Sequence, residues 1–140
     1  MSNDPGKRID VFFYGLFMDE ALLKEKGANP QNRRLAALEN FKLMIGERAT
    51  LIPASGAAVH GLLFSLTQAE INSLYAEPSV SEYRPEPVVA RLRNGDAIPA
   101  LCFNLPDPPS SSERNPQYAA KLKELAGRIG LPVEYVAKIT

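Results

Sequence analysis

The stretch DVFFYGLFMD, residues 10–19, decides how this chain begins to fold. Its first half is apolar and rich in residues that favour strands, and it is interrupted at Gly15. The residues after Asp19 favour a helix, so a strand is predicted to pass into a helix through a very short turn. Glycine lets the main chain approach a ligand closely, and N–H groups at a helix start attract a carboxylate. The same pattern also fits an ordinary strand-to-helix connection.

Further extended segments are predicted in the middle of the chain. Residues 27–32 form a loop by their Gly, Asn and Pro content, and residues 33–47 are expected to be extended with a kink. Residues 49–53 continue as a short strand, and Gly56 separates them from a strand over residues 57–66. This last strand is apolar on both faces, which is typical of a strand buried on two sides.

A hairpin is predicted over residues 83–105. Two strand-like segments, residues 83–93 and 97–105, flank Asn94 and Gly95. This residue pair suits a tight type I′ turn, in which both central residues have positive φ. The segment 106–112, rich in proline and serine, follows as a loop that is too short to link two domains.

Helices are predicted before and after this hairpin. Thr67 begins a capping-box pattern, and the helix that it starts must end before Pro78. A second helix is expected from Pro116 to Gly130, with a last short helix near Pro132. Periodicity alone therefore favours an α+β fold in one domain, residues 1–140, with mostly antiparallel strands and a few packed helices.

Composition excludes several classes of partner. The 140 residues contain 16 Lys and Arg and 16 Asp and Glu, so no net charge attracts nucleic acid or an anionic membrane. The single cysteine, Cys102, excludes an internal disulfide and reads as a buried strand position. The N-terminal residues lack the apolar segment of a signal peptide, and no apolar run reaches membrane-spanning length. We expect a cytoplasmic protein.

The residue inventory also excludes several chemistries. His60 is the single histidine, lies in an apolar strand and has no Gly-x-Ser-x-Gly serine as a partner, so we interpret it as structural. His and Cys are too few for a metal site, and no glycine-rich phosphate-binding loop is present, so no metal or other cofactor is expected. Any chemistry must depend on carboxylates, tyrosines and backbone amides.

Several short motifs follow the segment Tyr14-Gly15-Leu16-Phe17-Met18 along the chain. They are NFKL at 40–43, ATLIP at 49–53, VHGLLF at 59–64, NSL at 72–74, EYR at 82–84, NPQY at 115–118 and GLPVEY at 130–135. In this order, they resemble the motifs of the γ-glutamylcyclotransferase-like (AIG2-like) family, whose signature after the first strand is Tyr-Gly-Ser-x-Met/Leu. Ordered agreement of several motifs is far less frequent by chance than one match.

The resemblance implies a small, mostly antiparallel β-barrel with flanking helices and an enzyme of the transferase or lyase type. In this family the α-amine of a γ-glutamyl amine, amino acid or peptide attacks its own side-chain carbonyl and releases pyroglutamate (5-oxoproline). A glutamate carries the protons, and no cofactor is needed. The resemblance also implies that the substrate is bound by Tyr14, Gly15, Leu16, Phe17, Met18, Tyr83 and Tyr118.

The sequence departs from the family at the catalytic position. The family's glutamate stands four residues after the equivalent of Leu74, where this chain has Pro78. The neighbouring acids Glu77 and Glu82 are therefore both candidate catalytic residues, and Glu77 is favoured because it is only one residue from that position. A catalytically silent member that binds a small molecule is the alternative function. Arg48 and Arg84 are candidates to meet a substrate carboxylate, although surface ion pairs are the commoner fate of such residues.

Overall fold

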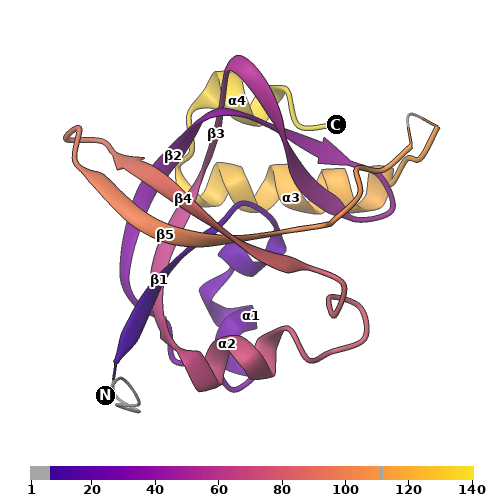
Figure 1. The fold of residues 1–140 in the computed structure, drawn as a ribbon. Coiled ribbons are helices and arrows are strands. Elements are labelled where there is room, and N and C mark those ends of the chain that lie inside the picture. The colour runs from indigo at the N-terminus through magenta and orange to yellow at the C-terminus, as the bar shows by residue number, and fades with distance from the viewer. Residues whose placement is uncertain (1–6, 111) are drawn as a thin grey trace.

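Five strands close into a barrel in the order β1-β3-β2-β4-β5 in the computed structural model, which describes residues 7–110 and 112–140 (Figure 1). All neighbouring strands pair antiparallel except β1 and β5, which are parallel. This confirms the α+β fold with a mostly antiparallel barrel and flanking helices. The elements are β1 (Arg8–Phe13), the 3-10 helix η1 (Leu16–Met18), α1 (Glu20–Glu25), β2 (Gln31–Ile45), β3 (Ala49–Thr67), α2 (Gln68–Leu74), β4 (Arg84–Leu92), β5 (Ala97–Asn104), α3 (Pro116–Ile129) and α4 (Val133–Ala137).

The alternation of side chains along β1 divides the core into two parts. Phe12 and Tyr14 belong to a buried cluster whose other fully buried members all come from strands, so these side chains point into the barrel. Val11 and Phe13 belong to a second cluster that also contains residues of the helices. Residues 61–66 of β3 are buried without interruption, as predicted for a strand covered on both sides.

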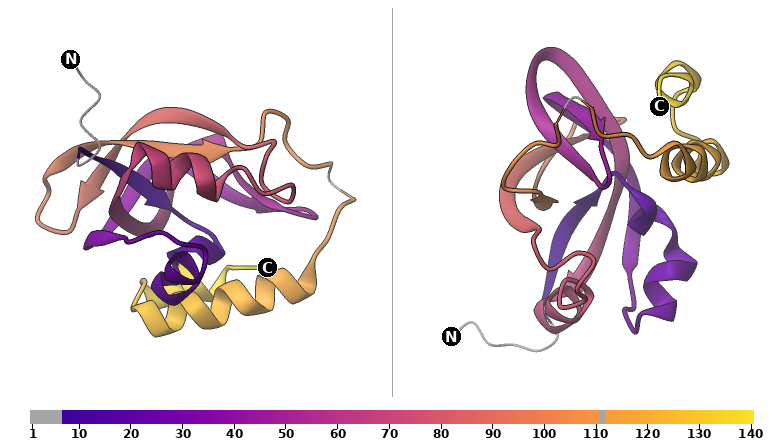
Figure 2. Two further views of the ribbon diagram at one scale, coloured as in Figure 1. Left: turned by 90° about the horizontal axis from the view of Figure 1, so that it is seen from below. Right: turned by 90° about the vertical axis from the view of Figure 1, so that its right-hand side faces the viewer.

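The helices begin and end where the sequence predicts. Asp19 caps α1, Thr67 and Glu70 form the complete capping box of α2, and Asn115 caps α3, which ends at Gly130 in the left-handed conformation. Helices α3 and α4 lie along one side of the barrel, while α2 lies at its end (Figure 2). No helix in residues 7–110 or 112–140 is both long and apolar enough to cross a membrane.

The long hairpin of β2 and β3 differs from the prediction in two respects. Strand β2 begins at Gln31, inside the predicted loop, and β3 is continuous where a break was predicted at Gly56. The residues 54–57 lie opposite Asn40, because Glu39 pairs with Ala58 and Phe41 with Pro53. Both Asn40 and Gly56 have positive φ, and the N–H of Gly56 donates to Asn40 Oδ1 at 3.1 Å. The glycine therefore belongs to an irregularity within the paired strands.

The β4–β5 hairpin is present, but the predicted type I′ turn is wrong. Gly95 has a φ of 95°, whereas Asn94 is not among the described residues with positive φ. The Gly95 N–H donates to the Leu92 carbonyl at 2.9 Å, and the Leu92 N–H donates to the Asp96 carbonyl at 2.8 Å. The connection is therefore a three-residue loop in which a left-handed glycine follows a tight turn. Asn94 instead accepts the Asp96 N–H through its side chain at 2.9 Å.

Replacing Gly95 by valine is expected to lower the free energy of unfolding by about 1 kcal/mol or more, because a β-branched residue is strained at positive φ. No atom lies within 4 Å of an added Cβ, so backbone conformation alone is tested. Urea unfolding of the variant and the parent measures the difference. Equal stability would contradict the left-handed conformation of this loop.

Candidate functional site

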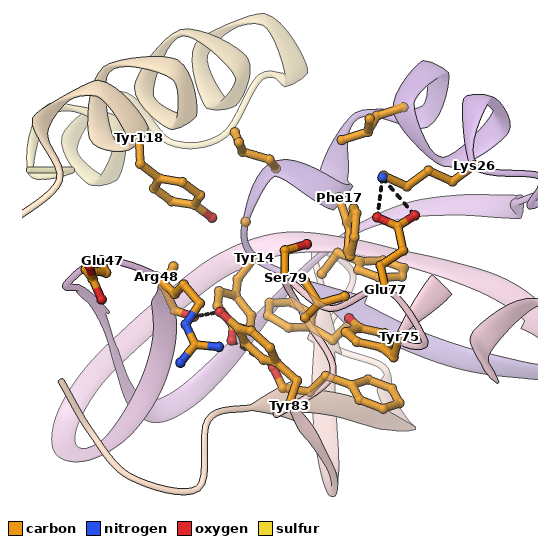
Figure 3. A pocket seen from close by; sticks show the side chains of 18 residues that line it. Tyr14, Phe17, Lys26, Glu47, Arg48, Tyr75, Glu77, Ser79, Tyr83 and Tyr118 are labelled. Carbon is orange, nitrogen blue, oxygen red and sulfur yellow. Dashed lines mark hydrogen bonds and ion pairs between the residues drawn. The ribbon is translucent and has the colours of Figure 1, made fainter. Parts of the chain in front are cut away.

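A cavity of about 280 Å³ opens beside the turn that follows β1 (Figure 3). Its wall combines the turn residues Gly15, Leu16 and Phe17 with aromatic side chains from four other parts of the chain. Tyr75 stacks on Phe103 with ring centroids 4.0 Å apart and meets the ring of Phe17 edge-on at 5.9 Å. Mutually packed rings make a rigid apolar surface. The cavity is therefore preformed and largely apolar.

Two tyrosines of the cavity use their hydroxyls to join separate strands. The Tyr14 hydroxyl donates to the Phe103 carbonyl at 2.8 Å, and the Tyr83 hydroxyl donates to the Ala49 carbonyl. Burial raises the pKa of both Tyr14 and Tyr83 well above its ordinary value. Both phenols therefore stay protonated near neutral pH and act as hydrogen-bond donors.

Tyr118 covers the turn from α3. A Cβ added to Gly15 would lie 2.6 Å from the Tyr118 hydroxyl oxygen, so the glycine leaves room for this side chain. Burial raises the pKa of Tyr118 to about 12, and a hydrogen bond from the Leu16 backbone N–H acts in the opposite direction. The phenol thus stays neutral and lies against the first N–H group of η1. A ligand that reaches this N–H also meets the Tyr118 hydroxyl.

The turn itself has N–H groups to offer to a ligand. In η1 the Met18 N–H donates to the Gly15 carbonyl at 3.0 Å, and the Asp19 N–H donates to the Leu16 carbonyl at 3.0 Å. The first N–H groups of such a helix, those of Leu16 and Phe17, have no partner inside it, and the Leu16 N–H donates to the Tyr118 hydroxyl. Met18 does not line the cavity, because its side chain is buried in the core. Four of the five predicted turn residues therefore lie in the cavity wall.

The two candidate acids lie in different environments. Glu77 lines the cavity, and both oxygens of its carboxylate accept from Lys26 Nζ, at 2.7 and 2.9 Å (Figure 3). Glu82 is not among the lining residues, and its side chain is 64% exposed and ion-paired with Arg48 at 2.9 Å. The structure therefore brings Glu77 together with the turn and leaves Glu82 outside.

Among the other charged residues of the wall, Arg48 was a predicted candidate to meet a substrate carboxylate, whereas Lys26 and Glu47 were not predicted. Lys26 lines the cavity, and Figure 3 places it and Glu77 at one end, with Glu47 and Arg48 at the other. Arg84, the other arginine considered, instead donates to backbone carbonyls of residues 81–83. Nothing in the local sequence of Lys26 distinguishes it from other exposed helical lysines, because its partner is 51 residues away.

The residues interpreted as structural lie outside this cavity. His60 packs edge-on against Tyr135 with ring centroids 5.0 Å apart, and burial lowers its pKa. Cys102 is fully buried in β5, where burial raises its pKa to about 12, so the thiol is unreactive. Within residues 7–110 and 112–140, no group of His, Cys, Asp and Glu side chains is arranged to hold a metal ion.

The fold is similar to several solved structures. One is described as a gamma-glutamyl cyclotransferase, with a TM-score of 0.80 and 23% identity over 95% of this chain and 86% of that chain. An uncharacterized protein from Homo sapiens has a TM-score of 0.77 and 24% identity, with 94% of this chain and 86% of that chain covered. YkqA from Bacillus subtilis has a TM-score of 0.75 and 22% identity over 94% of this chain, which spans 52% of YkqA. At these identities the similarity establishes the fold.

Family membership follows from the sequence. A comparison with curated protein sequences gives no match. The family model "Gamma-glutamyl cyclotransferase, AIG2-like" matches residues 11–122, which include β1, the turn, both candidate acids and Tyr118. Because this match covers most of the chain, the protein belongs to the γ-glutamyl cyclotransferase, AIG2-like family.

Proposed function

We propose that this protein releases pyroglutamate from a small γ-glutamyl compound, with Glu77 as general acid and base. The observation that carries the proposal is that the Glu77 carboxylate and the turn residues Gly15, Leu16 and Phe17 line one cavity. Family membership supplies the class of reaction. Cys102 is a free, buried thiol, and thiols stay reduced in the cytoplasm, which supports a cytoplasmic setting for the reaction.

The proposed reaction needs a proton carrier and no nucleophile from the protein. Glu77 accepts a proton from the substrate's α-ammonium, and the freed amine attacks the γ-carbonyl carbon to form the lactam C–N bond. The bond to the leaving nitrogen breaks as Glu77 returns its proton there. The α-nitrogen loses a second proton as it becomes the lactam N–H, and this proton passes through solvent to the released amine. One carboxylate in reach of both nitrogens can serve both transfers.

The turn provides a place for the substrate's α-carboxylate. The Phe17 N–H and the neutral Tyr118 hydroxyl, which itself accepts from the Leu16 N–H, are donors, and carboxylate oxygens accept from such groups. The aromatic wall around Tyr75 and Phe103 excludes water from the side-chain methylenes of a glutamyl group. A folded γ-glutamyl chain between the turn and Glu77 would hold its amine near its own carbonyl.

A screen of γ-glutamyl amines, amino acids and peptides for pyroglutamate release tests this function. Release from at least one compound, abolished by heat denaturation of the protein, is the expected result. If no compound yields pyroglutamate while pyroglutamate itself binds, the silent small-molecule binder is the correct function.

Replacing Gly15 by valine is expected to weaken pyroglutamate binding by about 10-fold or more, because the new side chain displaces the Tyr118 hydroxyl and covers the turn. Calorimetric titration of parent and variant measures the change. Tyr118→Phe, which keeps the ring and removes one donor, should weaken binding less. An unchanged affinity in Gly15→Val would place the ligand elsewhere, and thermal unfolding of each variant controls for folding.

A further inference from the structure

Lys26 makes a contact that the reaction as written does not use. Its Nζ lies 2.7 Å from one carboxylate oxygen of Glu77 and 2.9 Å from the other. The two side chains are 26% and 40% exposed, so the pair lies partly out of solvent in the cavity wall. Among the described residues, every hydrogen bond recorded for the Glu77 carboxylate comes from Lys26.

The backbone of Lys26 is held firmly in relation to the turn. The residue caps the C-terminus of α1, where its N–H donates to the carbonyls of Leu22 and Leu23 at 3.1 and 3.2 Å. Helix α1 directly follows η1 and is anchored by Leu23, which has no exposed surface. The ammonium group therefore extends from an element whose position is fixed by the same turn that lines the cavity.

The backbone of Glu77 is held less regularly. Helix α2 ends at Leu74, so Glu77 lies in the segment after the helix and immediately before Pro78. A glutamate side chain outside a helix samples many rotamers, and fixing it costs conformational entropy. The contact with Lys26 selects those rotamers that bring the carboxylate to the cavity end beside Phe17, as Figure 3 shows.

We propose that Lys26 is a positioning residue, which holds the Glu77 carboxylate in the orientation that the proton transfers require; this inference rests on the proposed function. A carboxylate has about four acceptor sites, so the two bonds from Nζ leave others for the substrate nitrogen. Lys26 makes no bond to the reacting atoms in this role. It acts by limiting where Glu77 can point, which is how supporting side chains maintain catalytic geometry.

Steady-state kinetics of Lys26→Met test the inference. We expect kcat for pyroglutamate release to fall by about 10-fold, because misplacement of a proton carrier slows the chemical step, while KM changes less than about twofold. Lys26→Arg, which keeps a charged donor to the carboxylate, should recover most of the rate. Lys24→Met is the matched control, since Lys24 is on the same helix and pairs with Glu20, outside the cavity.

The decisive measurement is Lys26→Met in a Glu77→Gln background. If Lys26 acts through Glu77, the second substitution produces no further loss, because groups that act as a unit are not additive. If the loss of rate in the double variant equals the product of the losses in the two single variants, and KM rises, Lys26 binds the substrate itself and the inference is overturned. Full activity of Lys26→Met in an active protein would also overturn it. Absence of pyroglutamate release from the parent would refute the proposed function and the inference with it.

Discussion

Glu77→Gln is expected to lower the rate of pyroglutamate release by about 100-fold or more, because glutamine keeps the shape of the side chain but cannot carry a proton. The amide oxygen of glutamine can still accept from Lys26 Nζ, so the side chain should remain in the cavity wall. Loss of a partly exposed ion pair costs about 1 kcal/mol or less, so folding should change little. Single-turnover and steady-state assays of purified variants measure the rate.

Glu82→Gln is the matched control for this substitution. Glu82 is five residues further along the chain, is 64% exposed and does not line the cavity, although its ion-pair partner Arg48 does. Its replacement should change the rate less than about threefold. A full rate in Glu77→Gln together with a large loss in Glu82→Gln would reverse the assignment of the acid. Thermal unfolding of both variants separates a catalytic loss from a folding defect.

The sequence identified both candidate acids and favoured Glu77 by its position, but it could not show which side chain enters the cavity. The motif spacing narrows the position to the neighbourhood of Pro78, and the choice depends on which side chain enters the cavity. That depends on where α2 ends and how the following segment turns, which are tertiary features. The contact of Lys26 with Glu77 could not be predicted from the sequence for the same reason. This contact joins two segments that only the folded barrel brings together.

Helix ends were predictable from the sequence, because the residue types found there satisfy a specific hydrogen-bonding or backbone requirement. The capping box at Thr67 and the left-handed Gly130 after α3 follow from hydrogen bonding and backbone sterics. Gly95 and Gly56 share a positive φ, yet one closes a three-residue hairpin loop and the other lies inside a continuous strand. Conformational freedom alone does not tell a turn from an irregularity between paired strands, because the partner strand decides.

Gly61 is a glycine whose role only the packed barrel reveals. It lies in β3, one residue before Leu62, which pairs with Phe13 at the end of β1. A Cβ at this position would overlap the carbonyl oxygen of Phe13 and come within 2.9 Å of the ring of Phe12. The backbones of β1 and β3 therefore approach too closely here for any side chain. The contact is immediately before Tyr14 and the turn, so it also fixes where the turn begins.

Gly61→Ala is therefore expected to lower the free energy of unfolding by about 3 kcal/mol, because the added methyl group forces two strand backbones apart in a closed barrel. Gly127→Ala is the matched control, since that glycine is exposed in α3 with no atom near its added Cβ. There the same substitution should raise stability by about 0.5–1 kcal/mol, as alanine favours a helix. Urea unfolding should therefore show a lower free energy of unfolding for Gly61→Ala than for the parent, and a higher one for Gly127→Ala. Equal stability of Gly61→Ala and the parent would mean that the backbones of β1 and β3 leave room for a side chain here.

Any fraction of Gly61→Ala that folds should also bind pyroglutamate more weakly, because displacement of the Phe13 carbonyl moves Tyr14 and the turn together.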